Sequence, residues 1–340
     1  MSPPRIRLAR RSRLELGDYP VDAVWAADGR ALVLASGEGE ILWWEPAAAA
    51  APDILGQHSG GALALAWQGA GQLFASSAQD GQVWLWDARE RTHRVLREAT
   101  QWSEQLAFSG NGRLLSVASG RELLLFDASG TQQATLPAHP GAIAALAWRQ
   151  KGAELVTAFN GGIRWYRFDA KAEVRDYPWA GACLTASWSP DGRVFASGLQ
   201  DGTVHFWYLA AEQNSQMKGY GAKVALTSWS ANSRYLASAA DSLIVVWDFG
   251  GRGPEGTRPI QLGAHTARLT QLAYQPVGTL LASGGRDCRL MLWQPAQGSE
   301  AIDADLLPDE IALIRWSPDG RSLLVADRSG ALTLYAIERS

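Results

Sequence analysis

The side chains of this sequence that could do acid–base or metal chemistry are histidines and aspartates at regular places. Three histidines each lie nine residues before a large aromatic residue: His58, His139 and His265. Four aspartates each follow an Ala-Ser pair by a few residues: Asp80, Asp201, Asp241 and Asp287. Imidazole and carboxylate groups can bind a metal ion or transfer protons in catalysis. Whether these groups can act together depends on the elements that position them.

Those elements are copies of one unit. A large aromatic residue recurs every 40 to 45 residues, at Trp25, Trp67, Phe108, Trp148, Trp188, Trp229, Tyr274 and Trp316. A second aromatic follows each of them after 18 or 19 residues, at Trp44, Trp86, Phe126, Tyr166, Trp207, Trp247, Trp293 and Tyr335. A register kept this closely indicates one supersecondary unit repeated eight times. The aspartates share a position in that register, so they belong to different units and do not form a pair.

Each unit contains the turn residues that separate short β-strands. A turn containing Gly follows most of the first aromatics, as at residues 28–30, 189–193 and 317–321. Gly accepts the positive φ of a tight hairpin, and Pro fixes φ at the start of the turn. Apolar strands such as residues 194–197 and 280–283 come next. Short strands between regular turns predict an all-β chain.

The unit resembles the WD repeat, whose consensus has a Gly-His pair, a Leu-Ala-Ser strand, an Asp turn and a closing Trp-Asp. The second unit matches it at His58, Ser76, Asp80 and Trp86. The seventh unit matches it at His265, Ser283, Asp287 and Trp293. In this family the histidine links the Asp turn to the Ser hydroxyl and the Trp N–H. The resemblance therefore implies that both polar sets are structural.

The resemblance extends from about residue 14 to 337 and implies a β-propeller. Eight units predict an all-β, eight-bladed closed propeller that occupies residues 1–340 as a single domain. A seven-bladed ring with one degenerate unit set aside is the alternative, and we disfavour it because no unit lacks its strands. The sequence ends on the third strand of unit eight, at residues 331–337. We expect residues 12–16 to supply the outer strand of that blade and close the ring.

Composition and motifs exclude several classes of function. The net charge is only −3 at pH 7, so neither a nucleic-acid nor a membrane surface is expected over the whole molecule. Five arginines between Arg5 and Arg13 could bind nucleic acid or acidic lipid, but a solvated outer strand is our preferred interpretation. His93 and His205 have no second ligand at a metal-binding spacing.

The sequence also lacks the common catalytic motifs and a disulfide framework. It contains no phosphate-binding glycine loop, no Gly-x-Ser-x-Gly and no His-Glu-x-x-His, so we expect no enzyme, no cofactor and no bound metal. Cys183 and Cys288 fall in units that are not neighbours. Two cysteines and no long apolar run favour the cytoplasm. We also expect a monomer. Most of the 16 Trp are expected in the core.

The resemblance directs the search for function to the top face, formed by the loops before the first strand and between the second and third. The register places two aromatic and four cationic residues there: Trp102, Phe159, Lys223, Arg268, Arg286 and Arg328. Trp and Arg often dominate the energetics of protein interfaces. We predict a non-catalytic scaffold that binds an acidic protein or peptide on this face. The alternative is a propeller that binds a small molecule or metal in its central channel.

Overall fold

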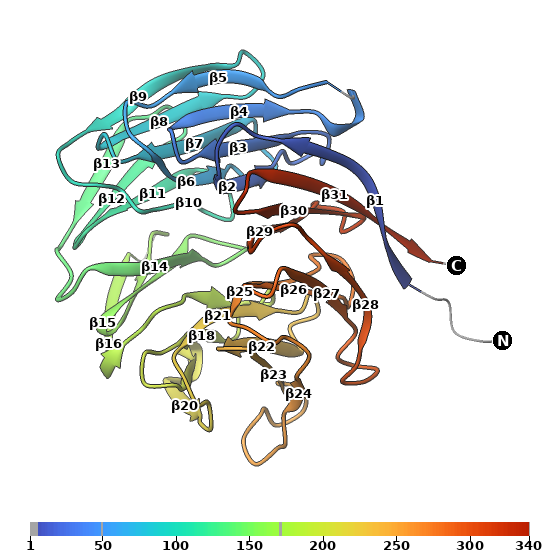
Figure 1. Cartoon of the computed structure of the whole chain (residues 1–340). Coiled ribbons are helices and arrows are strands. Elements are labelled where there is room, and N and C mark those ends of the chain that lie inside the picture. Colours follow the sequence, from blue (N-terminus) through green and yellow to red (C-terminus); the bar gives the residue numbers. More distant parts are fainter. Residues whose placement is uncertain (1–5, 49, 170–171, 340) are drawn as a thin grey trace.

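The computed structural model describes residues 6–48, 50–169 and 172–339, so Arg5 lies outside the described residues. Within these ranges the strands form eight antiparallel sheets around a central axis (Figure 1). Each sheet is one blade, and the first strands of neighbouring repeat units contact one another around the axis. The chain is an eight-bladed β-propeller, as the repeat count predicted, and the seven-bladed alternative is wrong.

The first four blades contain the following strands, from the axis outward. Blade 1 has β2 (Pro20–Trp25), β3 (Leu32–Ser36), β4 (Glu40–Trp44) and β5 (Asp53–Gln57). Blade 2 has β6 (Ala62–Trp67), β7 (Leu73–Ala78), β8 (Gln82–Asp87) and β9 (Thr92–Glu98). Blade 3 has β10 (Gln105–Phe108), β11 (Leu114–Ser119), β12 (Glu122–Asp127) and β13 (Gln132–Leu136). Blade 4 has β14 (Ile143–Trp148), β15 (Glu154–Arg167) and β16 (Glu173–Ala182).

The other four blades follow the same order. Blade 5 has β17 (Ser187–Trp188), β18 (Phe195–Gly198), β19 (Val204–Tyr208) and β20 (Gln213–Met217). Blade 6 has β21 (Val224–Trp229), β22 (Tyr235–Ala240), β23 (Leu243–Asp248) and β24 (Ile260–Leu262). Blade 7 has β25 (Leu269–Tyr274), β26 (Leu281–Gly285), β27 (Arg289–Trp293) and β28 (Ala301–Leu306). Blade 8 has β29 (Ile311–Trp316), β30 (Ser322–Asp327), β31 (Ala331–Arg339) and β1 (Ile6–Glu15). Two short 3-10 helices, η1 (Pro46–Ala48) and η2 (Leu209–Ala211), lie beside blades 1 and 5.

Blade 4 departs from the pattern because β15 passes through both middle positions of the sheet. Its first half pairs with β14 and its second half with β16. The Thr157 hydroxyl donates to the Arg164 carbonyl at 3.3 Å, so the two halves lie side by side. Gly161 and Gly162 have φ of +113° and +136°, which L-residues with side chains rarely adopt, and they form the bend.

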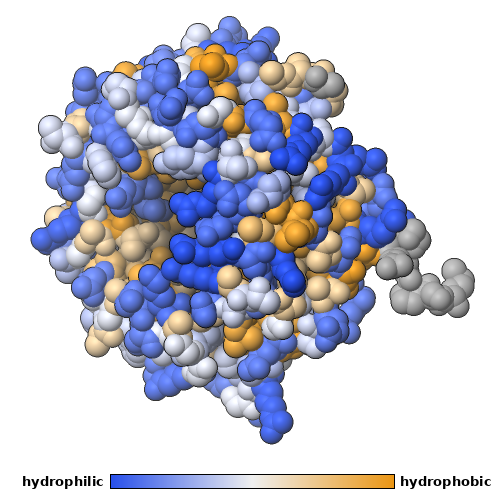
Figure 2. Space-filling model, in the orientation of Figure 1, coloured by the Kyte–Doolittle hydropathy of each residue, from blue (hydrophilic) through white to orange (hydrophobic). Residues whose placement is uncertain are grey.

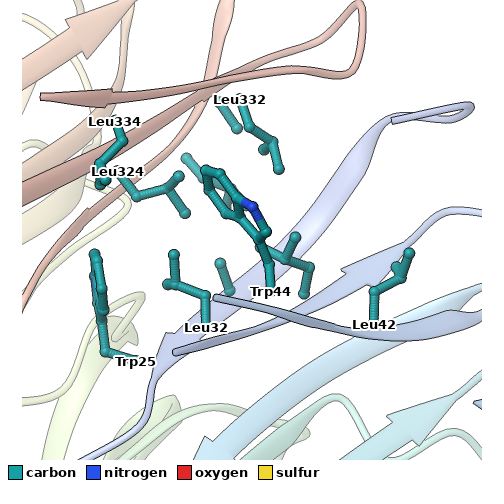
Figure 3. Packing of buried hydrophobic residues seen from close by; sticks show 11 residues of the cluster. Trp25, Leu32, Leu42, Trp44, Leu324, Leu332 and Leu334 are labelled. Carbon is teal, nitrogen blue, oxygen red and sulfur yellow. The ribbon is translucent and has the colours of Figure 1, made fainter. Parts of the chain in front are cut away.

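The hydrophobic core is divided into layers between neighbouring blades. In the layer between blades 8 and 1, Trp25, Leu32 and Trp44 pack against Leu324, Leu332 and Leu334 (Figure 3). All eight second aromatics of the repeat are buried. Seven of the eight first aromatics are buried too, and Trp67 is the exception, being only half-buried. Bulky rings at fixed places fill the space between twisted sheets, which accounts for the high Trp content.

The two ends of the chain meet in blade 8, where β1 pairs antiparallel with β31 (Figure 1). The strand starts at Ile6 and is longer than the predicted residues 12–16. Arg10 binds Asp305 of blade 7 with a 2.6 Å hydrogen bond from its Nε. Arg7 and Arg11 both bind Glu338, at 3.2 and 2.7 Å. These described arginines are therefore engaged in pairing along an outer strand.

Two remaining features concern membranes and thiols. Among the described residues, no helix has the length and apolar character needed to cross a membrane. Cys183 is buried beside blade 5, whereas Cys288 is partly exposed in blade 7, and neither forms a disulfide.

Candidate functional site

The polar set of blade 2 forms a continuous chain of hydrogen bonds. Trp86 Nε1 donates to Ser76 Oγ at 2.9 Å, and Ser76 Oγ lies 3.0 Å from His58 Nε2. His58 Nδ1 lies 3.1 Å from Asp80 Oδ2. Burial lowers the pKa of His58 although Asp80 opposes the shift, so the imidazole is neutral at pH 7. A neutral ring that donates to Asp80 and accepts from Ser76 satisfies every group in the set.

Blade 7 repeats this arrangement. His265 Nε2 and Trp293 Nε1 both lie 2.8 Å from Ser283 Oγ. His265 Nδ1 lies 3.0 Å from Asp287 Oδ2. Burial again lowers the pKa of His265, against the effect of Asp287. Because all four side chains are occupied with one another in each blade, neither set offers a free nucleophile, base or metal ligand.

Two further residues occupy the histidine position of the repeat, and the sequence reasoning missed them. Tyr220 precedes Ser238 by the same 18 residues that separate His58 from Ser76. Its hydroxyl accepts from Trp247 Nε1 at 2.7 Å and lies 2.5 Å from Ser238 Oγ. In the repeat unit of blade 5, Trp179 takes this position at the end of β16, and its ring packs on that of His205. The constant spacing was the signal that could have identified both.

The aspartates and histidines do not converge on a catalytic centre. Nowhere in the described ranges do three or more His, Cys, Asp or Glu side chains gather in a way that could hold a metal ion. On the inner strands, Asp22 accepts from Arg315 Nη2 at 2.8 Å and from the Leu65 amide at 2.9 Å. Arg315 also donates to Gln271 at 3.1 Å. This carboxylate of an inner strand is therefore already paired.

Three of the predicted cationic residues meet on the top face. Lys223, Arg268 and Arg286 are exposed and line one pocket of about 240 Å³ between blades 6 and 7. Backbone bonds fix the loops that carry them, because the Arg286 amide donates to the Arg268 carbonyl at 2.9 Å. The Leu269 amide likewise donates to the Asp241 carbonyl at 2.8 Å, which joins blade 7 to blade 6.

The electrostatics of this pocket favour an anion. Asp241 contributes the one carboxylate among the described residues that line it, against three cationic groups. Lys223 and Arg268 have no carboxylate within ion-pair distance in the described part of the chain, whereas Arg286 lies 3.6 Å from Glu310. Arg328 of blade 8 shares that Glu310, at 3.3 Å. In Figure 2, strongly hydrophilic side chains gather beside the central hollow, over the region of β25 and β29.

The two predicted aromatic residues lie apart from this pocket. Trp102 is 45% exposed in the loop before β10 of blade 3, far around the ring from blade 7. Its carbonyl accepts from Ser119 Oγ at 2.8 Å, which fixes the loop. Phe159 is only 3% exposed and packs edge-on against His139. The prediction that Phe159 offers a surface to a partner is wrong, because its ring is buried against His139.

Comparison with known families explains the repeat. The family model described as WD domain, G-beta repeat matches residues 53–87, 179–208, 212–248 and 256–294. The chain belongs to the WD-repeat family. The matches correspond to blades 2, 5, 6 and 7, and the cationic pocket lies between two of them. The three inner strands of blades 1, 3 and 8 and strands β14 and β15 of blade 4 lie outside the matches.

Curated relatives carry the same type of repeat. The B-type cell cycle switch protein ccs52A of Medicago truncatula is 24% identical over 71% of this chain and 52% of its own length. The WD repeat-containing protein slp1 of Schizosaccharomyces pombe is 23% identical over 68% of this chain and 49% of its own length. The small ribosomal subunit protein RACK1 of the same yeast is 29% identical over 45% of this chain and 39% of its own length. The WD-repeat chain thus spans about half the length of the first two relatives.

Proposed function

We propose that this WD-repeat propeller is a non-catalytic scaffold that binds an acidic segment of a protein partner on its top face. The pocket formed by Lys223, Arg268 and Arg286 supports this proposal, because it presents more positive than negative charge. Ammonium and guanidinium groups bind carboxylates with strong, charge-assisted hydrogen bonds. The names of the relatives point to different cellular roles, so the class of partner rests on the pocket.

The rest of the face supports a protein partner over a small anion. Arg328 extends the cationic surface onto blade 8, and it shares Glu310 with Arg286. A carboxylate from a partner would compete with Glu310 for the guanidinium groups of Arg286 and Arg328. It would also pair with Lys223 and Arg268, which have no carboxylate within ion-pair distance among the described residues. Each such contact at the centre of an interface contributes about 2 kcal/mol, or about 30-fold in affinity.

Charge reversal tests the proposal. The double variant Lys223→Glu, Arg268→Glu should reduce recovery of cross-linked partners from a native extract by about ten-fold or more, since it inverts the charge of the pocket. Arg289→Glu is the matched control, because Arg289 is exposed in the same blade and does not line the pocket. Equal recovery by the double variant and the wild-type protein would refute the assignment of this surface.

A further inference from the structure

A continuous depression lies on the opposite face of the ring. Two pockets of about 520 and 550 Å³ lie side by side there, and Arg30 and Glu45 line both. We call their union the blade-1 groove. It extends from the Arg89 side of blade 2, across the turn of blade 1, to Leu334 of blade 8. Each pocket has the volume of a ligand site.

The groove has apolar walls of aromatic rings. Trp43 and Trp67 line the first pocket, with ring centroids 6.3 Å apart. Trp67 is the one first aromatic of the described repeats that is not buried, and this pocket is what leaves it open. In the second pocket, Trp25 and Leu334 lie on opposite sides of the seam between blades 1 and 8 (Figure 3). A bulky apolar side chain in the first pocket would remove indole surface of Trp43 and Trp67 from water.

The floor of the first pocket consists of small side chains. Ala26, Ala31 and Ala88 are buried at its base, and Ala70 is exposed at its edge. Methyl groups at these positions leave space that a larger residue of this chain would fill. The pocket is therefore a gap in the packing between blades 1 and 2, with aromatic sides.

Arg30 lies between the two pockets with no partner for its guanidinium among the described residues. Arg234 has the same place in the turn of blade 6, where it binds Asp248 at 2.8 Å. The residue of blade 1 that corresponds to Asp248 is Glu45, but Glu45 accepts from Trp43 Nε1 at 2.8 Å and pairs with Arg91 at 3.3 Å. Asp28 also lines the first pocket, but it accepts from the Arg30 backbone amide at 2.9 Å and forms no ion pair with the guanidinium in the described part of the chain. The Arg30 guanidinium is therefore left to bind an anion from outside.

From these features we infer that the blade-1 groove binds an extended segment of a partner protein, with an apolar side chain against Trp43 and Trp67 and a carboxylate on Arg30. The surface is independent of the cationic pocket, because it involves other blades and the opposite face. The WD-repeat chain would then hold two segments at once, one on each face of the ring.

The probes for this inference are two pools of short fluorescein-labelled peptides. Members of one pool have a single Phe or Leu followed by two acidic residues in a Gly-Ser background, and members of the other have Lys in place of the acids. By fluorescence polarisation, the full chain should bind the acidic pool about ten-fold more tightly than the Lys pool. Arg30→Glu should abolish that preference. Ala70→Tyr, which fills the groove, should weaken binding of the acidic pool by about ten-fold.

Two control variants make the outcome decisive. Arg193→Glu changes the equivalent turn residue of blade 5, which is already paired with Asp191 at 2.6 Å, and should leave binding unchanged. Lys223→Glu, Arg268→Glu should also leave it unchanged. Equal binding of the two pools, no binding of either, or an equal loss in Arg193→Glu and Arg30→Glu would overturn the inference. Loss in the Lys223, Arg268 variant alone would place the peptide in the cationic pocket, which refutes the groove and supports the proposed function.

Discussion

The buried imidazole of His205 should make the propeller sensitive to mild acid. His205 is 1% exposed in β19, and its ring lies between those of Trp179 and Trp207, with centroid distances of 3.8 and 4.2 Å. Its Nε2 donates to Asn214 Oδ1 at 3.0 Å, and its Nδ1 has no partner among the described residues. Burial lowers the pKa of His205 to about 4, because a charged ring would lose its hydration in this position.

The direction in which the free energy of unfolding changes with pH follows from the pKa of His205 in the folded and in the unfolded protein. The pKa is lower in the folded protein than the value of about 6.5 in the unfolded chain, so the unfolded chain takes up the proton first as the pH falls. The free energy of unfolding therefore decreases from about pH 6.5 down to about pH 4. Between pH 7.5 and pH 5 the expected loss from this one group is about 2 kcal/mol.

The variant His205→Phe isolates this contribution. Phe keeps an aromatic ring between the two indoles and removes the site of protonation. Urea unfolding at pH 7.5 and at pH 5 gives the free energy of unfolding of each protein. The wild-type protein should lose about 2 kcal/mol more than the variant, because His139 and the carboxylates titrate equally in both. An equal loss in the two proteins would show that His205 is not held neutral by burial.

Substitutions at three positions test other features of the ring, each by urea unfolding at neutral pH. Tyr220→Phe should cost about 1 to 3 kcal/mol, since Trp247 Nε1 loses its acceptor, and Tyr220→His should restore part of that stability. Arg315→Met should cost a similar amount by leaving the inner-strand carboxylate of Asp22 without its ion-pair partner, and a cost near zero would show that this ion pair does not stabilise the ring. Leu14→Asp should destabilise blade 8 by about 1 to 3 kcal/mol and expose the β1–β31 seam to limited proteolysis, which an unchanged digestion pattern would contradict.

The sequence predicts the architecture well because the repeat is carried by large side chains. Trp86 and Trp293 have the same neighbours in their blades, so their spacing identifies the unit directly. The role of Tyr220 could not be predicted in this way. A Tyr hydroxyl can replace an imidazole nitrogen as a hydrogen-bond partner, but the consensus names only histidine.

The surface is less predictable because exposure depends on packing between units. The repeat register places Phe159 on the top face, yet its ring is buried and packs edge-on against His139. Trp67 occupies the same position of the repeat as seven buried aromatic residues, but the small alanines beside it leave it only half-buried. In the cationic pocket, the register placed Lys223, Arg268 and Arg286 on neighbouring loops, but it could not show that Arg286 shares Glu310 with Arg328.

The pairing of β1 with β31 constrains how the chain can fold while the ribosome is making it. Glu15 and Ala331 face each other in the finished sheet, although about 300 residues separate them. At a synthesis rate of about 5–20 residues per second, β1 waits roughly 15 to 60 s for its partner. Through that interval its backbone edge is open to other nascent chains. The arginines that later bind Glu338 and Asp305 make the waiting strand strongly cationic, so copies on neighbouring ribosomes repel one another until the ring can close.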